Sequence, residues 1–196
     1  MTPLAASALL GFHDGSMQAG AASGLWRAIE DNHRCNGLLW DEEDLARRRH
    51  APDAEIAGNK RAIDRFNQQR NDAIERVDEH LFEFFFGKTP PRETAKLNSE
   101  TPGAMIDRLS ILSLKVRSMR AQTERTDVDR AHVEECLQKL NRLQEQRADL
   151  AACLDRLLAE CARGESRFKI YRQFKMYNDP KLNPAVYGES KRSTQA

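Results

Sequence analysis

Four segments of this 196-residue chain repeat apolar residues every three or four positions, a spacing that a helix brings onto one face. The segments cover residues 26–47, 56–84, 105–119 and 133–161. The third carries a second apolar row, which predicts a central helix with neighbours on two sides. The fourth is the longest and would extend for roughly 50 Å as a helix.

Helix-breaking residues separate these segments. Pro52 follows the first segment, and Gly87 with the Pro90-Pro91 turn follows the second. Thr101 stands before Pro102, a cap residue followed by proline at the first helical position, so it predicts the start of the third helix. Short connections make neighbouring helices antiparallel.

The prediction is therefore an all-α fold: an antiparallel bundle of four long helices with a short N-terminal segment and a basic and aromatic C-terminal tail. Residues 1–190 are predicted to form a single helical domain, and residues 191–196 a disordered tail. A coiled-coil homodimer formed through the fourth helix is the alternative.

Charge and cysteine usage limit the partners and the compartment. Lys and Arg number 31 against 30 Asp and Glu, so the net charge of +1 argues against nucleic acid as a partner. No segment has the length and apolar character of a membrane span. The four cysteines form no CxxC pair, which favours reduced thiols and a cytoplasmic location.

Polar residues occupy positions on the first two helical faces where apolar residues are expected. Such residues are costly to bury unless they are paired or bound to a ligand. A turn near Ala51 would place Asn36 and Asn67 at similar heights, so the polar residues form two layers and not a scatter. The set comprises His33, Asn36, Glu43, Arg47, Lys60, Asn67 and Arg70.

Two interpretations of these layers remain open. One is a self-satisfied network that sets the register of the helices, as a buried Asn does in coiled coils. The other is a ligand site, favoured by the density of polar residues and by the capacity of Arg to bind phosphate through two hydrogen bonds. In that interpretation Glu43 and Asp107 are the candidate catalytic residues, and the ligand-binding residues are His33, Asn36, Arg47, Lys60, Asn67, Arg70, Asn71 and Lys175.

Metal chemistry is a weaker alternative. Glu30 and His33 have the E-x-x-H spacing of di-iron bundles, but no second copy lies within the helices. The carboxylates of Glu43, Asp44, Asp72 and Asp107 suit Mg²⁺ shared with a phosphate, although the paired E-x-x-E motifs of bundle pyrophosphatases are absent. No metal-binding residue is therefore assigned, and Mg²⁺ stands as the candidate cofactor.

Basic and aromatic residues alternate between Arg163 and Lys181. The simpler interpretation is an amphipathic tail that packs Phe168, Tyr171 and Phe174 on the bundle. The sharper one is a lid whose Arg and Lys residues close over the polar layers and bind an anion. The two interpretations are compatible.

Four motifs give the chain a family resemblance. They begin at Asn36 (NGLLWDEEDLAR), Asn59 (NKRAIDRFNQQRND), Thr101 (TPGAMIDRLSIL) and Gln173 (QFKMYNDP). Together they resemble the DUF4254 family of bacterial proteins, and the resemblance covers most of the chain. It implies a setting in lipopolysaccharide and surface-glycan synthesis, where members lie beside glycosyltransferases.

The resemblance supplies no catalytic residues, but it favours a phosphorylated sugar or nucleotide sugar as the ligand. The expected function is binding, or binding and processing, of such a ligand. The alternative is a non-catalytic helical partner of a glycosyltransferase or another envelope-biosynthesis enzyme.

Overall fold

The fold consists of five helices and one very short parallel sheet. The computed structural model describes residues 2–16, 24–174, 176, 179–185 and 187–188. The helices are α1 (Ala6–His13), α2 (Gly24–Ala46), α3 (Asp53–Phe86), α4 (Pro102–Thr123) and α5 (Arg130–Arg163), and the strands are β1 (Lys96–Leu97) and β2 (Ser166–Arg167). The prediction of a predominantly helical fold is confirmed.

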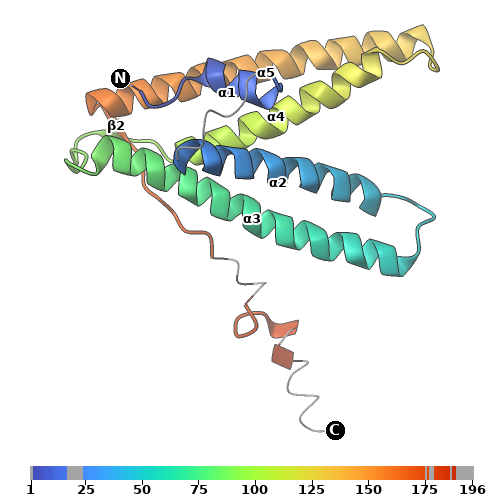
Figure 1. Ribbon diagram of the computed structural model, residues 1–196, viewed down its shortest axis with the longest axis horizontal. Helices are drawn as coiled ribbons and strands as arrows, with labels where there is room; N and C mark the ends of the chain where they lie inside the picture. The colour runs from blue at the N-terminus through green and yellow to red at the C-terminus, as the bar shows by residue number, and fades with distance from the viewer. Residues whose placement is uncertain (1, 17–23, 175, 177–178, 186, 189–196) are drawn as a thin grey trace.

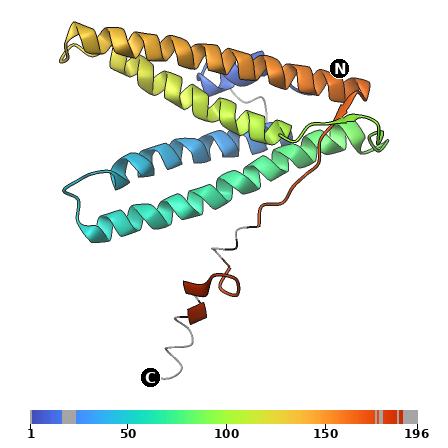
Figure 2. The same ribbon diagram turned by 180° about the vertical axis from the view of Figure 1, so that it is seen from behind.

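The long helices form two hairpins, α2–α3 and α4–α5 (Figure 1). Contacts are most extensive within each hairpin, and α4 also contacts both α2 and α3. The hairpins meet at the end where α4 begins and diverge toward their tips (Figure 2). The second apolar row of the third segment predicted a central helix, and α4 does have neighbours on more than one side.

Local capping explains where the helices start and stop. The Thr101 hydroxyl accepts a hydrogen bond from the Ala104 backbone N–H at 3.2 Å, which confirms the cap predicted before Pro102. Asp129 caps α5 in the same way through the His132 N–H at 2.8 Å. Gly164 ends α5 with a φ of 70°, a left-handed conformation that favours glycine.

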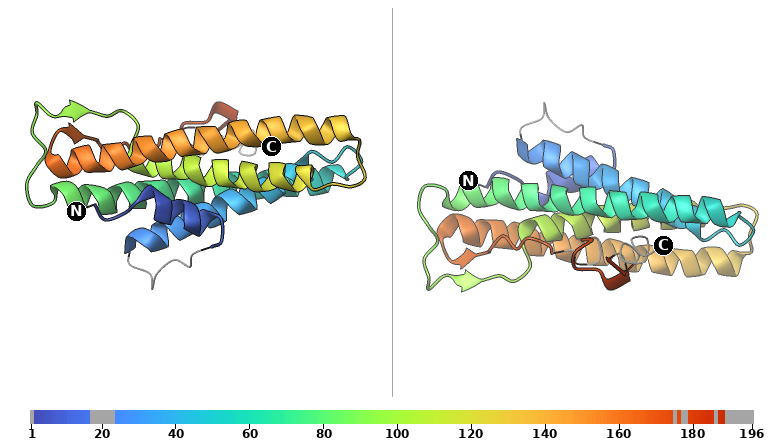
Figure 3. Two further views of the ribbon diagram at one scale, coloured as in Figure 1. Left: turned by 90° about the horizontal axis from the view of Figure 1, so that it is seen from above. Right: turned by 90° about the horizontal axis from the view of Figure 1, so that it is seen from below.

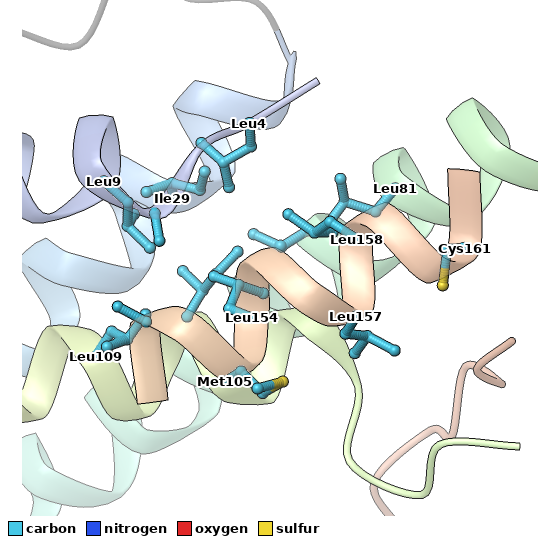
Figure 4. Close-up of a cluster of buried hydrophobic side chains, with 14 of the residues drawn as sticks. Leu4, Leu9, Ile29, Leu81, Met105, Leu109, Leu154, Leu157, Leu158 and Cys161 are labelled. Carbon is cyan, nitrogen blue, oxygen red and sulfur yellow. The ribbon is translucent and has the colours of Figure 1, made fainter. Parts of the chain in front are cut away.

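The hydrophobic core lies at the end where the hairpins meet. Leu154 and Leu158 of α5 pack there with Ile29, Leu81 and Leu109 from three other helices (Figure 4). Helix α1 contacts α4 and α5 (Figure 3). The ring of its Phe12 also packs against Trp26 of α2, with ring centroids 5.8 Å apart. This arrangement leaves the middle and the tips of the hairpins with fewer apolar contacts.

Strands β1 and β2 were not predicted. They pair in parallel, with Lys96 opposite Ser166 and Leu97 opposite Arg167, and they join the α3–α4 connection to the chain that follows α5. Two residues per strand give no periodic pattern, so only the long-range pairing reveals them.

The prediction for the tail is wrong for two of its three aromatic residues. Phe168 is buried against Phe82 and Phe86, as expected, but Tyr171 is 58% exposed and Phe174 is 88% exposed. Residues 168–174 run across α3 as an extended segment, not as an amphipathic helix (Figure 1).

The structure bears on the predictions for a membrane span and for the cysteines. Within the described ranges, none of the helices has both the length and the apolar character needed to cross a bilayer. All four cysteines are unpaired; three are buried, whereas Cys153 on α5 is exposed and is not the core residue expected.

Candidate functional site

A buried polar network joins α2 to α4. The side-chain amides of Asn32 and Asn36 both donate to Oδ1 of Asp107, at 2.8 and 2.9 Å. Asn36 also donates to the Ser110 hydroxyl at 3.0 Å. All four side chains are buried, so the network aligns the two helices through hydrogen bonds in a region where unpaired polar groups would be costly.

His33 extends this network toward α1. Its Nδ1 lies 2.8 Å from the Ser110 hydroxyl oxygen. Burial, followed by the charge of Arg117, lowers the pKa of His33, which favours the neutral ring. Since Ser110 already accepts from Asn36, its hydroxyl proton is available to donate to a neutral Nδ1. When Nδ1 accepts in this way, His33 carries its own proton on Nε2.

A cavity of about 400 Å³ opens beside the network, where the hairpins diverge. Its size is within the range of small-molecule sites. Residues of α2, α3 and α4 line it: Asn36, Leu39, Trp40, Glu43, Asp44, Arg47, Asn67, Arg70, Ile111 and Leu114. The Trp40 ring and three aliphatic side chains form its apolar wall, and the remaining residues supply polar groups.

Arg70 is a residue of this cavity whose hydrogen-bonding capacity is only partly used. Its side chain is 28% exposed, and its buried Nε has no hydrogen-bond partner among the described residues. The nearest carboxylate oxygen, Oδ1 of Asp107, lies 3.9 Å from that nitrogen, which is too long for a hydrogen bond. The guanidinium therefore retains donors for an additional acceptor, and a phosphate oxygen suits this geometry.

Glu43 and Arg47 lie at the cavity mouth and pair with each other. Their side chains approach to 2.9 Å, and Arg47 also donates to the Glu43 backbone oxygen at 2.7 Å. Both side chains are substantially exposed, so this pair contributes little stability and can rearrange around a ligand. Asn67 also lines the cavity and makes no hydrogen bond with any residue that the structure describes.

Five of the predicted site residues line this one cavity. They are Asn36, Glu43, Arg47, Asn67 and Arg70. Asn36 and Asn67, which the sequence places at similar heights, line this same cavity from the two helices of the hairpin. Asn36 belongs both to the closed hydrogen-bond network and to the lining of the cavity beside it.

The other predicted residues lie elsewhere. Asp107 sits behind the cavity and contacts it only through Asn36 and Arg70. His33 and the buried Asn71 do not line it. Lys60 is exposed on α3, where it pairs with Asp64 at 2.7 Å. Lys175 lies outside the described residues.

The expected lid does not lie over the cavity in the part of the tail that the structure describes. Arg172 pairs with Glu79 and, at 2.6 Å, with Glu75 of α3, neither of which lines the cavity. The charge of Arg172 is compensated by this acidic pair. The extended tail therefore contacts α3 and not the polar layers.

Asn32 and Trp40 were not predicted as site residues. Asn32 stands four residues before Asn36, so helical spacing could have identified it as a residue on the same face. Trp40 stands four residues after Asn36 and was assigned to the apolar seam alone.

No group of three or more His, Cys, Asp or Glu side chains within the described ranges is arranged to hold a metal ion. Glu30 of the E-x-x-H motif pairs with Arg27, and His33 is bonded to Ser110. At the cavity, Glu43 and Asp44 are the carboxylates that line the wall.

Comparison with known proteins supports the resemblance seen in the sequence. The model of DUF4254, described as a protein of unknown function, matches residues 26–170. The chain belongs to the DUF4254 family. No curated protein and no solved structure gives a significant match. In this DUF4254 protein the matched region contains α2 from Trp26 onward and all of α3, α4 and α5, and with them the residues that line the cavity and form the buried network.

Proposed function

We propose that this DUF4254 protein binds a phosphorylated sugar or nucleotide sugar in the cavity between its hairpins. The observation that carries the proposal is Arg70, a half-buried guanidinium whose Nε lacks a hydrogen-bond acceptor. In this proposal the four long helices act as one antiparallel bundle, held together at its packed end, and the ligand enters between the hairpin tips.

The surrounding residues suit the parts of such a ligand. Arg70 would hold the phosphate, with Arg47 completing its coordination at the mouth. Asn67 and the free carbonyl edge of the Asn36 amide would read hydroxyl groups, and Trp40 would cover an apolar face of the sugar or base. Asp107 is a positioning residue, since it holds the Asn36 amide and stands behind Arg70.

Glu43 is the candidate general acid or base. It lines the cavity and is half-exposed, so its carboxylate can reach a ligand directly or bind Mg²⁺ together with a phosphate. Asp44 is the second carboxylate at that position. A reaction at this site would transfer or hydrolyse a group attached to the phosphate that Arg70 holds.

Thermal denaturation against a panel of sugar phosphates and nucleotide sugars, with and without Mg²⁺, tests the binding. A ligand at a hundredfold excess over its Kd should stabilise the fold by about 2.7 kcal/mol. Arg70→Ala should abolish the shift. Arg65→Ala is the matched control, because Arg65 is exposed on the same helix and does not line the cavity.

The outcomes distinguish binding from catalysis. Glu43→Gln should keep the thermal shift and lose turnover if Glu43 acts in a reaction, and should change neither if the protein only binds. No shift with any compound, or an equal loss in Arg65→Ala and Arg70→Ala, would contradict the proposed site.

A second candidate function rests on a different observation. Beyond β2, Tyr171, Phe174, Met176, Leu182 and Tyr187 are exposed apolar residues on a segment that leaves the helices (Figure 2). Such residues are typical of a protein–protein contact. This favours a helical partner of a glycosyltransferase, and co-purification with a co-expressed glycosyltransferase should then fail on deletion of residues 171–196 and survive Arg70→Ala.

A further inference from the structure

A second cavity lies on the opposite face of α4. It measures about 350 Å³ and is enclosed by the C-terminal end of α1, by α2 and by α4. It shares no lining residue with the first cavity. Five of the residues around it carry titratable or charged side chains: His13, Asp14, His33, Arg117 and Arg120.

His13 is a buried polar side chain without a partner. The residue is 7% exposed, and neither ring nitrogen has a hydrogen-bond partner among the described residues. Its ring stacks on that of His33, with centroids 4.5 Å apart and planes at 24°. Leaving a buried donor unsatisfied costs stability, so a built-in His at this position requires an explanation beyond packing.

The charge around the cavity is positive. Arg117 and Arg120 line it, and neither forms an ion pair with any residue in the described ranges. Arg147 of α5 reaches the same place, where it contacts Asp14 at 2.6 Å and the Ser113 hydroxyl at 3.2 Å. Three guanidinium groups therefore face one carboxylate, which leaves an excess of two positive charges near the two imidazoles.

The same field acts on the histidines. Burial, with the neighbouring His33 and Arg147 acting in the same direction, lowers the pKa of His13 to about 3. Both rings are therefore neutral near pH 7, so each can donate one N–H while the guanidinium groups supply the charge.

We propose that this second cavity binds a phosphate group, held by the guanidinium groups of Arg117 and Arg120 and by an N–H of His13. The site takes a tetrahedral oxyanion, because unpaired arginines and a neutral ring donor favour acceptor-only oxygens. It is independent of the sugar-phosphate cavity: the ligand bound here contacts α1 and α4, not α3.

The bound phosphate has one structural consequence for the first site. His33 lines the second cavity and bonds Ser110, which accepts from Asn36, a residue that lines the first cavity. A ligand that moves the His33 ring therefore acts on the Asn36 layer through two hydrogen bonds. The proposed binding does not depend on that connection.

The full-length protein labelled with ¹⁵N-histidine provides the test. Imidazole spectra are recorded at constant ionic strength during titration with inorganic phosphate, and separately with glucose 1-phosphate and sulfate. His13 and His33 should shift along saturable curves, while the exposed His50 should not. Saturation with inorganic phosphate alone identifies a free-anion site, and tighter saturation with glucose 1-phosphate identifies a phosphomonoester site.

Matched variants separate a site from general electrostatic attraction. Arg117→Gln with Arg120→Gln should weaken binding by at least about tenfold, the effect of losing a charge-assisted hydrogen bond. Arg130→Gln with Arg156→Gln removes the same charge from exposed positions on α5 and should leave the affinity unchanged. Arg70→Ala should also leave it unchanged, so failure of the first site does not alter this result.

Two results would overturn the proposal. One is the absence of saturable shifts at His13 and His33 with all three anions. The other is an equal loss of affinity in the two double variants. Arg117→Gln alone serves as the second variant should the double variant unfold, which circular dichroism detects.

Discussion

Asp107 and His13 are buried to a similar extent, but they differ in their hydrogen bonding. Asp107 accepts two amide hydrogen bonds, from Asn32 and Asn36. His13 accepts and donates none within the described residues. A buried carboxylate with good donors is compatible with a stable core, whereas a buried neutral imidazole without partners makes stability sensitive to pH. We therefore expect substitutions of the two residues to affect stability in different ways.

His13 should make the protein less stable in mild acid. The pKa of His13 is about 3 in the folded chain against 6.5 for the free side chain. Between these values the unfolded chain binds a proton that the folded chain excludes, so the free energy of unfolding falls as the pH drops below 6.5, by up to about 1.4 kcal/mol per pH unit. Urea denaturation between pH 7 and 4.5 should show a shallower decline for His13→Gln.

Two controls accompany this measurement, in buffers without phosphate. His50→Gln alters an exposed residue and should follow the wild-type decline. Asp78 should contribute with the opposite sign, because burial raises its pKa to about 6 and the folded chain then binds the extra proton between pH 6 and 4. Asp78→Asn should therefore steepen the decline. A His13→Gln profile parallel to that of the wild type would contradict the assignment.

At the scale of elements, α4 is the helix that connects everything else. Its first turn lies against α3, where the Gly103 N–H donates to Asp78 at 2.7 Å. Its middle carries Ser110 and Asp107 toward α2, and its two faces line the two cavities. The close approach of α4 to α3 at Gly103 therefore helps to set the position of α4, which lines both cavities.

Gly103→Ala should destabilise the protein although alanine favours helix. A Cβ at this position would lie 2.6 Å from the Ile74 backbone oxygen and 2.8 Å from the Asp78 carboxylate. Since the oxygen belongs to the backbone of α3, the two helices must separate, at a cost of about 1–3 kcal/mol. Chemical denaturation measures this change.

Gly58→Ala is the matched control within α3. A Cβ there meets nothing within 4 Å, so the substitution should stabilise the protein by about 0.5–1 kcal/mol through helix propensity. Equal effects of the two substitutions would mean that the close contact of α4 with α3 does not exist in solution.

At the scale of the whole molecule, stability and binding are separated along the hairpins. The apolar core occupies the end where α1, α4 and α5 meet the α2–α3 hairpin, as Figure 4 shows. The polar network and the first cavity lie further along, where the hairpins diverge. A ligand between the hairpins can therefore change their separation without disturbing the core.

Truncation of the tail should show where the folded unit ends. Deletion of residues 171–196 removes the exposed pairing of Arg172 with α3 and should leave the thermal midpoint almost unchanged. Deletion from residue 166 onward also removes β2 and the buried Phe168, at a cost of about 3–5 kcal/mol. A large loss already at the shorter deletion would show that the tail is part of the fold.

The sequence by itself determined the helices and much of the first cavity. Apolar spacing, Pro52 and the Thr101-Pro102 start are local signals, and each acts within a few residues. A short turn joins α2 to α3, and counting residues from it predicted that Asn36 and Asn67 lie close together; both line the first cavity. Helical geometry explains this success, since rise and rotation per residue are constant.

Only the tertiary structure decided how the hairpins meet. Asp107 does not line the cavity as predicted, because the rotation of α4 against α2 depends on packing between distant residues. His13 faces His33 only because α1 folds back on α4 and α5, and the tail lies on α3 because Glu75 and Glu79 pair with Arg172. Such contacts join residues far apart in the chain, and no local period records them.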